Sequence, residues 1–130
     1  MLTDPSTWTV LVVDDDDDNR VVVRGLLEMA GVKVIVADSG KACLQRLAEN
    51  LPTLVLLDIL MPRMSGLEVL KAIRQQETMR ELPVIAVTAK AMPGGPEELL
   101  EEGFTGYITK PFTDLVPHIR AILKAQYSLE

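Results

Sequence analysis

The sequence predicts a single-domain α/β protein, with a doubly wound parallel sheet of five strands and helices on both faces. Two observations support this class. Short apolar runs alternate along the chain with segments whose apolar residues recur every three or four positions. Such alternation of strands and helices is typical of a parallel sheet covered on both sides. In addition, the chain has 130 residues, 48% apolar and 25% charged, which suits one folded domain.

Five runs rich in apolar and β-branched residues are the predicted strands. The third is the clearest, because Leu54-Val55-Leu56-Leu57 leads directly into Asp58. A continuous apolar run of this length indicates a strand that is buried on both faces. A carboxylate at the end of such a strand needs a compensating partner, since an unpaired buried charge is costly. The predicted strands span residues 8–13, 32–37, 53–57, 82–87 and 105–109.

The predicted helices lie between and after these strands. Ser65 and Glu68 form a capping box before the third helix. The segment from Pro93 to Pro96 shortens the fourth helix to about two turns. Pro117 is tolerated only in a first turn, so the fifth helix begins no earlier than Thr113. The predicted helices span residues 19–30, 41–49, 66–76, 96–102 and 114–126; the apolar stripe of the first comprises Val22, Val23, Leu26, Leu27 and Ala30.

We expect loose tails at residues 1–7 and 127–130 around a domain at residues 8–126. Nineteen acids and thirteen bases give a net charge of −6, which argues against direct nucleic-acid binding. The single cysteine, Cys43, cannot form an intramolecular disulfide, which fits a reducing compartment. The N-terminus lacks the pattern of a signal peptide, and no apolar run approaches the ~18 residues of a membrane span. These features predict a cytoplasmic protein without membrane contact.

Candidate functional residues stand where the predicted strands end. Asp14 and Asp15 follow the first strand, Asp58 the third, Thr88 the fourth and Lys110 the fifth. Carboxyl ends of parallel strands share one edge of the sheet, so these side chains should lie together. Three close carboxylates repel unless a proton or cation is shared, and oxygen ligands of this kind suit Mg²⁺. A carboxylate can act as a nucleophile towards a phosphoryl group, which a hydroxyl and an ammonium group would bind.

The ordered set of motifs resembles the receiver domain of two-component response regulators. Asp58 precedes Thr88 by 30 positions, and Thr88 precedes Lys110 by 22, as in that family. The resemblance extends over residues 9–126 and implies a flavodoxin-like (βα)5 receiver fold. Its motifs are Asp14-Asp15 after Val10-Leu11-Val12-Val13, Leu57-Asp58-Ile59-Leu60-Met61-Pro62, Thr88-Ala89 and Lys110-Pro111.

The resemblance implies a role for each acidic residue. Asp58 would be the phosphoacceptor, taking a phosphoryl group from a histidine kinase or a histidine phosphotransfer protein. Asp14, Asp15 and Asp58, with the backbone carbonyl of Leu60, would bind Mg²⁺. The protein would not be an enzyme beyond its own phosphotransfer and a slow autodephosphorylation.

The resemblance also implies a conformational switch. Lys110 would contact the acyl phosphate, and Thr88 would hydrogen-bond a phosphate oxygen. Tyr107 would then turn inward behind Thr88, and the Lys110–Pro111 peptide bond is expected to be cis. A stand-alone receiver of this kind would control a downstream protein effector, as a monomer or a phosphorylation-dependent dimer.

Two other interpretations remain open. A small aspartate-nucleophile phosphohydrolase of the dehalogenase type would carry its nucleophile after the first strand, in an Asp-x-Asp-x-Thr pattern. The run from Asp14 to Asp18 instead has an acid at its fifth position. A receiver-like interaction module that is never phosphorylated would not need the complete set of five site residues. An EF-hand starting at Asp14 is excluded, because Asn19 and Gly25 stand where glycine and glutamate are required.

Two segments receive weaker interpretations. We interpret Asp16 to Asp18 as a solvated acidic stretch without a role in the site, although one of these acids, or Asn19, can cap the helix that follows. The prolines near the fourth helix suggest that the loop Ala89–Gly95 is mobile in the unphosphorylated state. They also put the usual dimer surface of the fourth and fifth helices in doubt.

Overall fold

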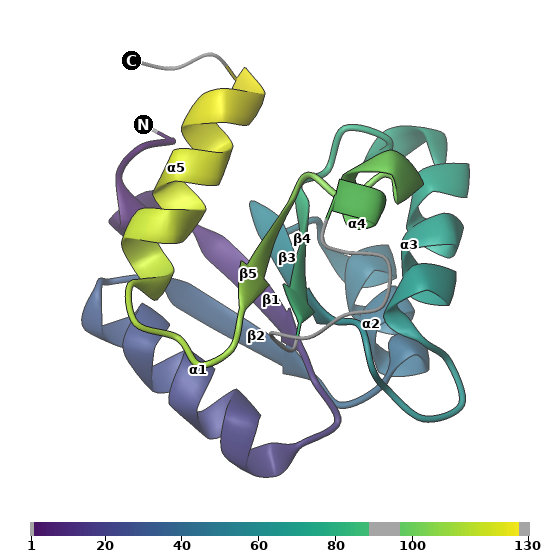
Figure 1. Cartoon of the computed structure of the whole chain (residues 1–130), viewed down its shortest axis with the longest axis horizontal. Coiled ribbons are helices and arrows are strands. Elements are labelled where there is room, and N and C mark those ends of the chain that lie inside the picture. The colour runs from purple at the N-terminus through teal and green to yellow at the C-terminus, as the bar shows by residue number, and fades with distance from the viewer. Residues whose placement is uncertain (1, 89–96, 128–130) are drawn as a thin grey trace.

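The structure is a computed structural model that describes residues 2–88 and 97–127. It contains a five-stranded parallel sheet in the order β2-β1-β3-β4-β5 (Figure 1), which confirms the predicted doubly wound fold class. The strands are β1 (Thr9–Val13), β2 (Lys33–Ala37), β3 (Leu54–Asp58), β4 (Val84–Thr88) and β5 (Gly106–Thr109). The helices are α1 (Asp17–Met29), α2 (Gly40–Glu49), α3 (Gly66–Gln75), α4 (Glu97–Glu102) and α5 (Leu115–Tyr127), with 3₁₀ turns at Pro5–Thr7 and Glu77–Met79.

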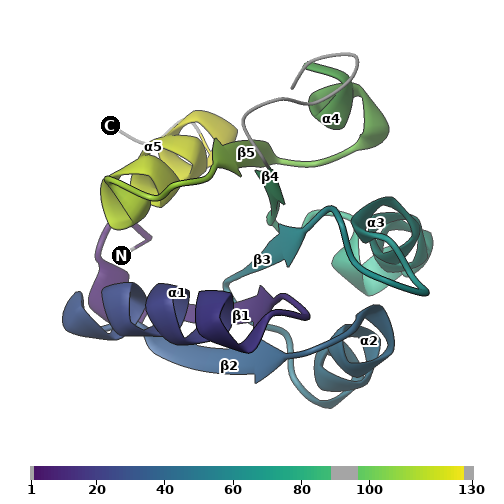
Figure 2. The same cartoon turned by 60° about the horizontal axis from the view of Figure 1, so that its bottom comes forward.

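The helices cover the two faces of the sheet. α1 and α5 lie on one face, and α2, α3 and α4 lie on the other (Figure 2). Each face has its own apolar core, one built around Leu27 and Ile119 and the other around Cys43 and Ile73. Cys43 is fully buried, and burial raises the pKa of its thiol to about 12. It is therefore a packing residue.

The central strand β3 joins both cores. All five of its residues are buried, and their side chains alternate between the two faces. Val55 and Leu57 pack with α2 and α3, whereas Leu54 and Leu56 pack with α1 and α5. This double burial explains the continuous apolar run that the sequence shows before Asp58.

Helix α1 differs from its prediction at its start and on its faces. It begins at Asp17 rather than Asn19, because the Asp16 side chain caps it by accepting from the Asn19 N–H at 3.1 Å. Only Val23 and Leu27 of α1 are buried. The other large members of the predicted stripe, Val22 and Leu26, are 55% and 37% exposed, so the prediction assigned too many residues to the buried face. Val21 and Met29 are apolar as well and exposed at 70% and 87%.

The predicted loose tail before the first strand is also wrong from residue 2 onward. Asp4 caps the 3₁₀ turn that follows it. The indole N–H of Trp8 donates to the Leu2 carbonyl at 2.7 Å, and Nε of Arg120 donates to the Thr3 carbonyl at 3.0 Å. The segment is therefore fastened to Trp8 and to α5 through its backbone carbonyls, which no side-chain pattern in the sequence reveals.

The last two helices agree with the prediction. α4 has only six residues, and Pro117 stands in the first turn of α5. The Lys110–Pro111 peptide bond is cis, as expected. The predicted mobility of the loop Ala89–Gly95 concerns residues outside the described ranges. Within residues 2–88 and 97–127, no helix combines the length and apolarity needed to cross a membrane.

Arg74 on α3 fastens two loops at the amino edge of the sheet. Its Nη1 donates to the carbonyls of Met79 and Leu82 at 2.9 and 2.7 Å. Its Nε and Nη2 donate to the Gly103 carbonyl at 3.3 and 3.2 Å. One guanidinium thus satisfies three carbonyls at the ends of two connections, which its fixed fork geometry permits.

We expect Arg74→Met to lower the free energy of unfolding by about 2 kcal/mol, because three carbonyls lose charge-assisted donors. The measurement is urea unfolding followed by circular dichroism. Lys71→Met on the exposed side of the same helix is the control and should change stability by less than about 0.5 kcal/mol. Equal effects of the two substitutions would show that Arg74 contributes nothing through these bonds.

Candidate functional site

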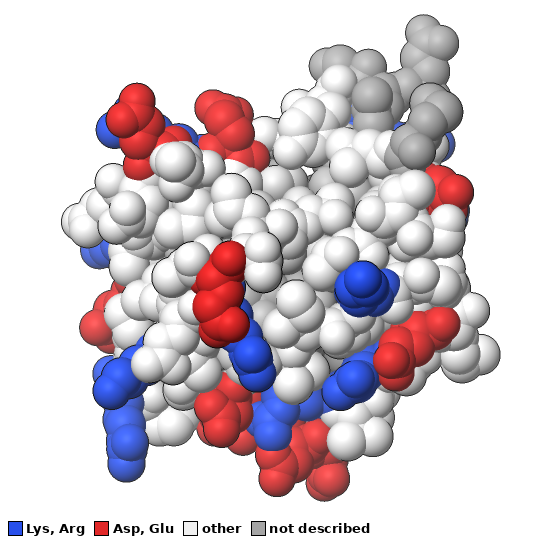
Figure 3. All heavy atoms as spheres, turned by 180° about the vertical axis from the view of Figure 1, so that it is seen from behind, with Lys and Arg blue, Asp and Glu red and all other residues white. Residues whose placement is uncertain are grey.

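The sheet brings the predicted site residues to its carboxyl edge. Asp14 follows β1, Asp58 ends β3, Thr88 ends β4 and Lys110 follows β5. The register places Val13 beside Leu57, Asp58 beside Val87, and Thr88 beside Thr109. Charged side chains gather at this lower edge of the molecule, below a broad face where they are sparse (Figure 3).

Three carboxylates form the centre of the site. Asp14, Asp15 and Asp58 each offer one oxygen, and these oxygens lie within 4.8 Å of one another. Asp14 and Asp58 are buried, at 5% and 7% exposure, while Asp15 is exposed. A cluster of two buried carboxylates and one exposed carboxylate fits a hard divalent cation that keeps free coordination positions for other oxygens. The donor set therefore suits Mg²⁺.

Lys110 approaches the same carboxylates from β5. Its Nζ lies 3.6 Å from Oδ2 of Asp58 and 3.8 Å from Oδ2 of Asp14. The lysine side chain is 30% exposed, so its ammonium group faces both the buried acids and solvent. It can therefore offset negative charge now on the carboxylates or later on an incoming anion.

Backbone groups orient the two buried carboxylates. The Leu60 N–H donates to Oδ1 of Asp58 at 3.1 Å, and the Asp16 N–H donates to Oδ1 of Asp14 at 3.0 Å. Each carboxylate thus has one oxygen fixed by the chain that follows it, and the other oxygen directed towards Lys110. The Leu60 side chain, two residues after Asp58, is 76% exposed to solvent.

Gly66 allows α3 to start close to the end of β3. A Cβ at this position would lie 2.6 Å from the Asp58 carbonyl oxygen and 2.8 Å from Cα of Ile59. The Gly66 N–H donates to the Ile59 carbonyl at 3.0 Å. The capping box of Ser65 and Glu68, predicted from the sequence, is present in the same turn. These contacts hold the loop that carries Asp58 and Leu60.

The Asp58 carboxyl group titrates unusually high. Its pKa is raised from 3.8 to about 6, mainly by burial and in second place by the negative charge of Asp14. Lys110 and the hydrogen bond from Leu60 act in the opposite direction. The carboxylate is thus poorly solvated yet still mostly ionised at neutral pH, which favours a cation or an electrophile as its partner.

Thr88 and Tyr107 face the same side of the sheet. Thr88 is 3% exposed and lies two residues beyond Ala86, which packs in the core under α2 and α3. Tyr107 pairs with Ala86 in the register and is half-buried against that same core. A threonine at the site and a tyrosine behind it therefore share one layer, which also contains α4. Their roles as switch residues remain predictions.

Comparisons with known proteins identify the family. Residues 10–122 match the response regulator receiver domain. The polar-differentiation response regulator DivK of Brucella ovis is 40% identical over 119 residues, covering 92% of this chain and 95% of that protein. A putative response regulator from Chloroflexus aurantiacus has a TM-score of 0.83 at 34% identity, covering 89% of this chain and 97% of that one. A CheY-like receiver domain protein from Methanospirillum hungatei has a TM-score of 0.77 at 34% identity, covering 92% of this chain and 97% of that one.

The chain therefore belongs to the response regulator receiver domain family of two-component systems. The acidic pocket of Asp14, Asp15 and Asp58 fits the aspartyl phosphate and magnesium chemistry of that family. The resemblance drawn from the sequence motifs is thus confirmed at the level of family and fold.

The predicted cap of the first helix by one of the later acids is confirmed, since Asp16 caps α1. The sequence interpretation missed that the Asp16 N–H also orients the Asp14 carboxylate, and that Asp17 pairs with Arg20. Arg20 was not singled out, although its Nη1 donates to the Asp14 carbonyl at 2.6 Å. A signal was available, because Arg20 is the first base after five consecutive acids.

We expect Asp58→Asn to raise the free energy of unfolding by roughly 2 kcal/mol at pH 8 without divalent cations. The folded-state pKa of about 6 exceeds the unfolded value of 3.8, so the folded protein binds this proton first. The destabilisation is full above pH 6 and is relieved as pH falls towards 4. The advantage of the variant should therefore shrink over this range in urea unfolding; an advantage that is independent of pH would contradict the assignment.

Proposed function

We propose that this protein is a phosphorylation-controlled switch in which Asp58 accepts a phosphoryl group in a Mg²⁺-dependent reaction. The donor would be the phosphohistidine of a histidine kinase or of a histidine phosphotransfer protein. The observation that supports this best is the joint position of Asp58, its two neighbouring acids and Lys110 at one edge of the sheet. Membership of the receiver family supports the same chemistry.

In the proposed transfer, a carboxylate oxygen of Asp58 forms the new bond to phosphorus. The phosphorus–nitrogen bond of the donor breaks, and its electron pair returns to the imidazole. Mg²⁺, held by Asp14, Asp15, Asp58 and the Leu60 carbonyl, would offset the charge of the phosphoryl oxygens. Lys110 already contacts Asp58 and would move its ammonium group to the acyl phosphate.

The proposed switch passes from Thr88 to the outer surface. The Thr88 hydroxyl would donate a hydrogen bond to a phosphate oxygen, and Tyr107 would turn inward behind it. Both side chains face the layer of α4, so their movement would alter the surface formed by α4, β5 and α5. A downstream protein effector would recognise that surface, with the switch acting as a monomer or as a phosphorylation-dependent dimer.

The same evidence supports the remaining parts of the proposal. We expect no turnover beyond the protein's own phosphotransfer and a slow autodephosphorylation. A phosphohydrolase of the dehalogenase type would carry its nucleophile after the first strand, whereas Asp58 ends the central strand β3. The net charge of −6 supports action without direct nucleic-acid contact. A cytoplasmic location is consistent with the free, buried Cys43.

Incubation with acetyl phosphate and Mg²⁺ should add one phosphoryl group, seen as a single adduct in the intact mass. Asp58→Asn should abolish the adduct, and chelation of Mg²⁺ should prevent it. Thr88→Ser, which keeps the hydroxyl, is the control and should retain the adduct. No adduct from any phosphodonor would favour the passive interaction module, and multiple turnover of phosphate esters would favour a hydrolase.

A protein donor also needs a surface on which to dock, and the exposed apolar face of α1, which starts next to the acidic pair, supports a proposal for this surface. Val21, Val22 and Met29 are large apolar side chains that are more than half exposed on this helix. Gly25 lies among them with no atom within 4 Å of a Cβ built there, so a partner can approach the backbone closely. We propose that an apolar helix face of the phosphodonor packs here while its phosphohistidine reaches Asp58.

We expect the double substitution of Val21 and Val22 to serine to slow phosphotransfer from a phosphohistidine protein at least tenfold. The rate with acetyl phosphate should stay unchanged, because a small donor needs no docking surface. Leu51→Ser is the control, since Leu51 is 53% exposed but lies before β3, at the opposite edge of the sheet. Equal slowing with both donors would place the effect in the pocket rather than on the surface.

A further inference from the structure

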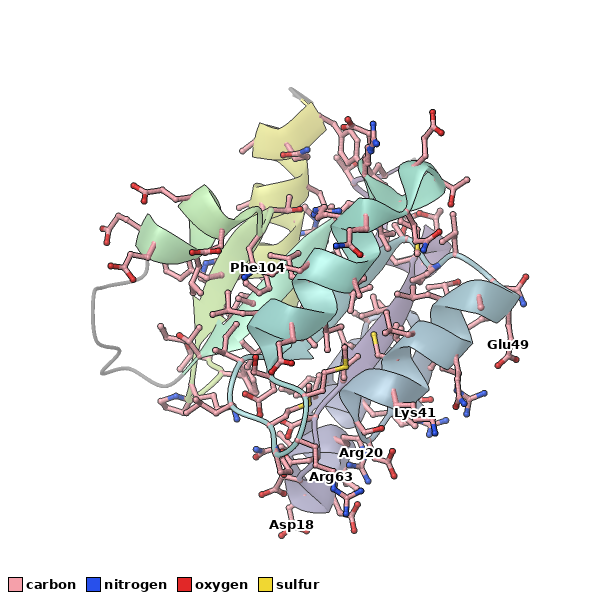
Figure 4. All side chains as sticks on the ribbon, turned by 90° about the vertical axis from the view of Figure 1, so that its right-hand side faces the viewer. Asp18, Arg20, Lys41, Glu49, Arg63 and Phe104 are labelled. Carbon is pink, nitrogen blue, oxygen red and sulfur yellow. The ribbon has the colours of Figure 1, made fainter. Side chains whose placement is uncertain are left out.

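Arg20 connects the first turn of α1 to the loop that carries the acidic pair. Its Nη1 donates to the Asp14 carbonyl at 2.6 Å, and its Nη2 forms an ion pair with the Asp17 carboxylate. The Arg20 side chain is only 17% exposed, whereas that of Asp17 is 86% exposed. Figure 4 shows Arg20 with Asp18 and Arg63 at the end of the molecule where α1 begins.

The hydrogen bond to Asp14 is the more informative of these two contacts. The Asp14 carboxylate is held from one side by the Asp16 N–H and from the other by Lys110. The backbone N–H of Asp14 donates to the Ala37 carbonyl of β2 at 3.1 Å. Arg20 binds the carbonyl of this residue, where the chain leaves β1 and turns towards Asp15. The direction of that turn decides where the Asp15 carboxylate points.

An opposing charge effect makes this arrangement testable. Arg20 brings a positive charge close to a cluster meant for a divalent cation, and like charges repel. If charge were its main influence, removing Arg20 would strengthen cation binding. If orientation of the loop dominates, removing Arg20 would weaken cation binding. The two effects have opposite signs.

We infer that Arg20 is a positioning residue of the metal site, which holds the Asp14–Asp15 turn in the geometry that binds Mg²⁺. The inference rests on the proposed function, because it takes the acidic cluster as a Mg²⁺ site. A planar guanidinium suits the role, since it reaches a carbonyl and a carboxylate at once through two nitrogens. Five consecutive acids would otherwise repel one another along this turn.

Arg20→Gln should weaken Mg²⁺ binding about tenfold, as removal of groups that orient metal ligands typically does. Isothermal titration calorimetry of the unphosphorylated protein measures this without any phosphotransfer. Arg24→Gln is the matched control, because it makes the same change one turn later on α1, where Arg24 pairs with Glu28 at 3.4 Å. It should change the Mg²⁺ affinity by less than twofold.

Arg20→Lys separates orientation from charge. It retains the positive charge but cannot bridge the Asp14 carbonyl and Asp17 with two nitrogens, so it should weaken binding several-fold as well. Hydrogen exchange at the amides of residues 15–17 in the absence of Mg²⁺ should be faster in both Arg20 variants than in Arg24→Gln. Urea unfolding verifies that each variant is folded under the titration conditions.

The outcomes distinguish this inference from the proposed function. If the unsubstituted protein binds no Mg²⁺ at millimolar concentration, the proposed function fails. If it binds Mg²⁺ while Arg20→Gln binds equally well or more tightly, the positioning role is overturned and the proposed function stands. Weaker binding by Arg20→Gln but unchanged binding by Arg20→Lys would show that the bridge made by two guanidinium nitrogens is not needed, which also overturns the inferred role.

Discussion

The burial of the Asp58 carboxylate at the end of the central strand is the constraint on which the rest of the site depends. A charge in this position, with Asp14 beside it, opposes folding, and its pKa of about 6 records that opposition. Lys110 and the Leu60 N–H compensate only in part. A cation placed among these carboxylates would offset their mutual repulsion, so the same burial that opposes folding favours a positively charged partner at this edge.

The apolar burial of the parallel sheet offsets the cost of this buried carboxylate. Both cores meet on β3, so the strand that ends in the Asp58 carboxylate is buried along its whole length. Burial of an apolar side chain contributes about 1.5–3 kcal/mol, so the four apolar residues of β3 together outweigh the cost of about 3 kcal/mol that the raised Asp58 pKa represents. Asp14, Thr88 and Lys110 lie at the ends of β1, β4 and β5, so the parallel sheet places them at the same edge as Asp58.

The site could be predicted from the sequence because its residues follow strand ends, and strand ends are marked by sharp changes from apolar to polar residues. The capping box at Ser65 was equally visible, since its two side chains act within one turn. The buried face of α1 could not be predicted as well, because eight of its thirteen residues carry no charge and apolar residues occur all round the helix. The role of Arg20 and the attachment of the N-terminal segment at Leu2 and Thr3 were missed, because these hydrogen bonds go to backbone carbonyls, which every residue has.

Helix α1 has two tasks that compete for its side chains. Its inner face commits only Val23 and Leu27 to the core, which leaves apolar residues free for its outer face. A helix held by so few buried residues needs other attachments, and its first turn supplies them through the Asp16 cap and the Arg20 bond to the Asp14 carbonyl. The Arg20 bond thus joins the start of α1 directly to the turn that carries Asp14 and Asp15, so the helix and the acidic cluster share one attachment.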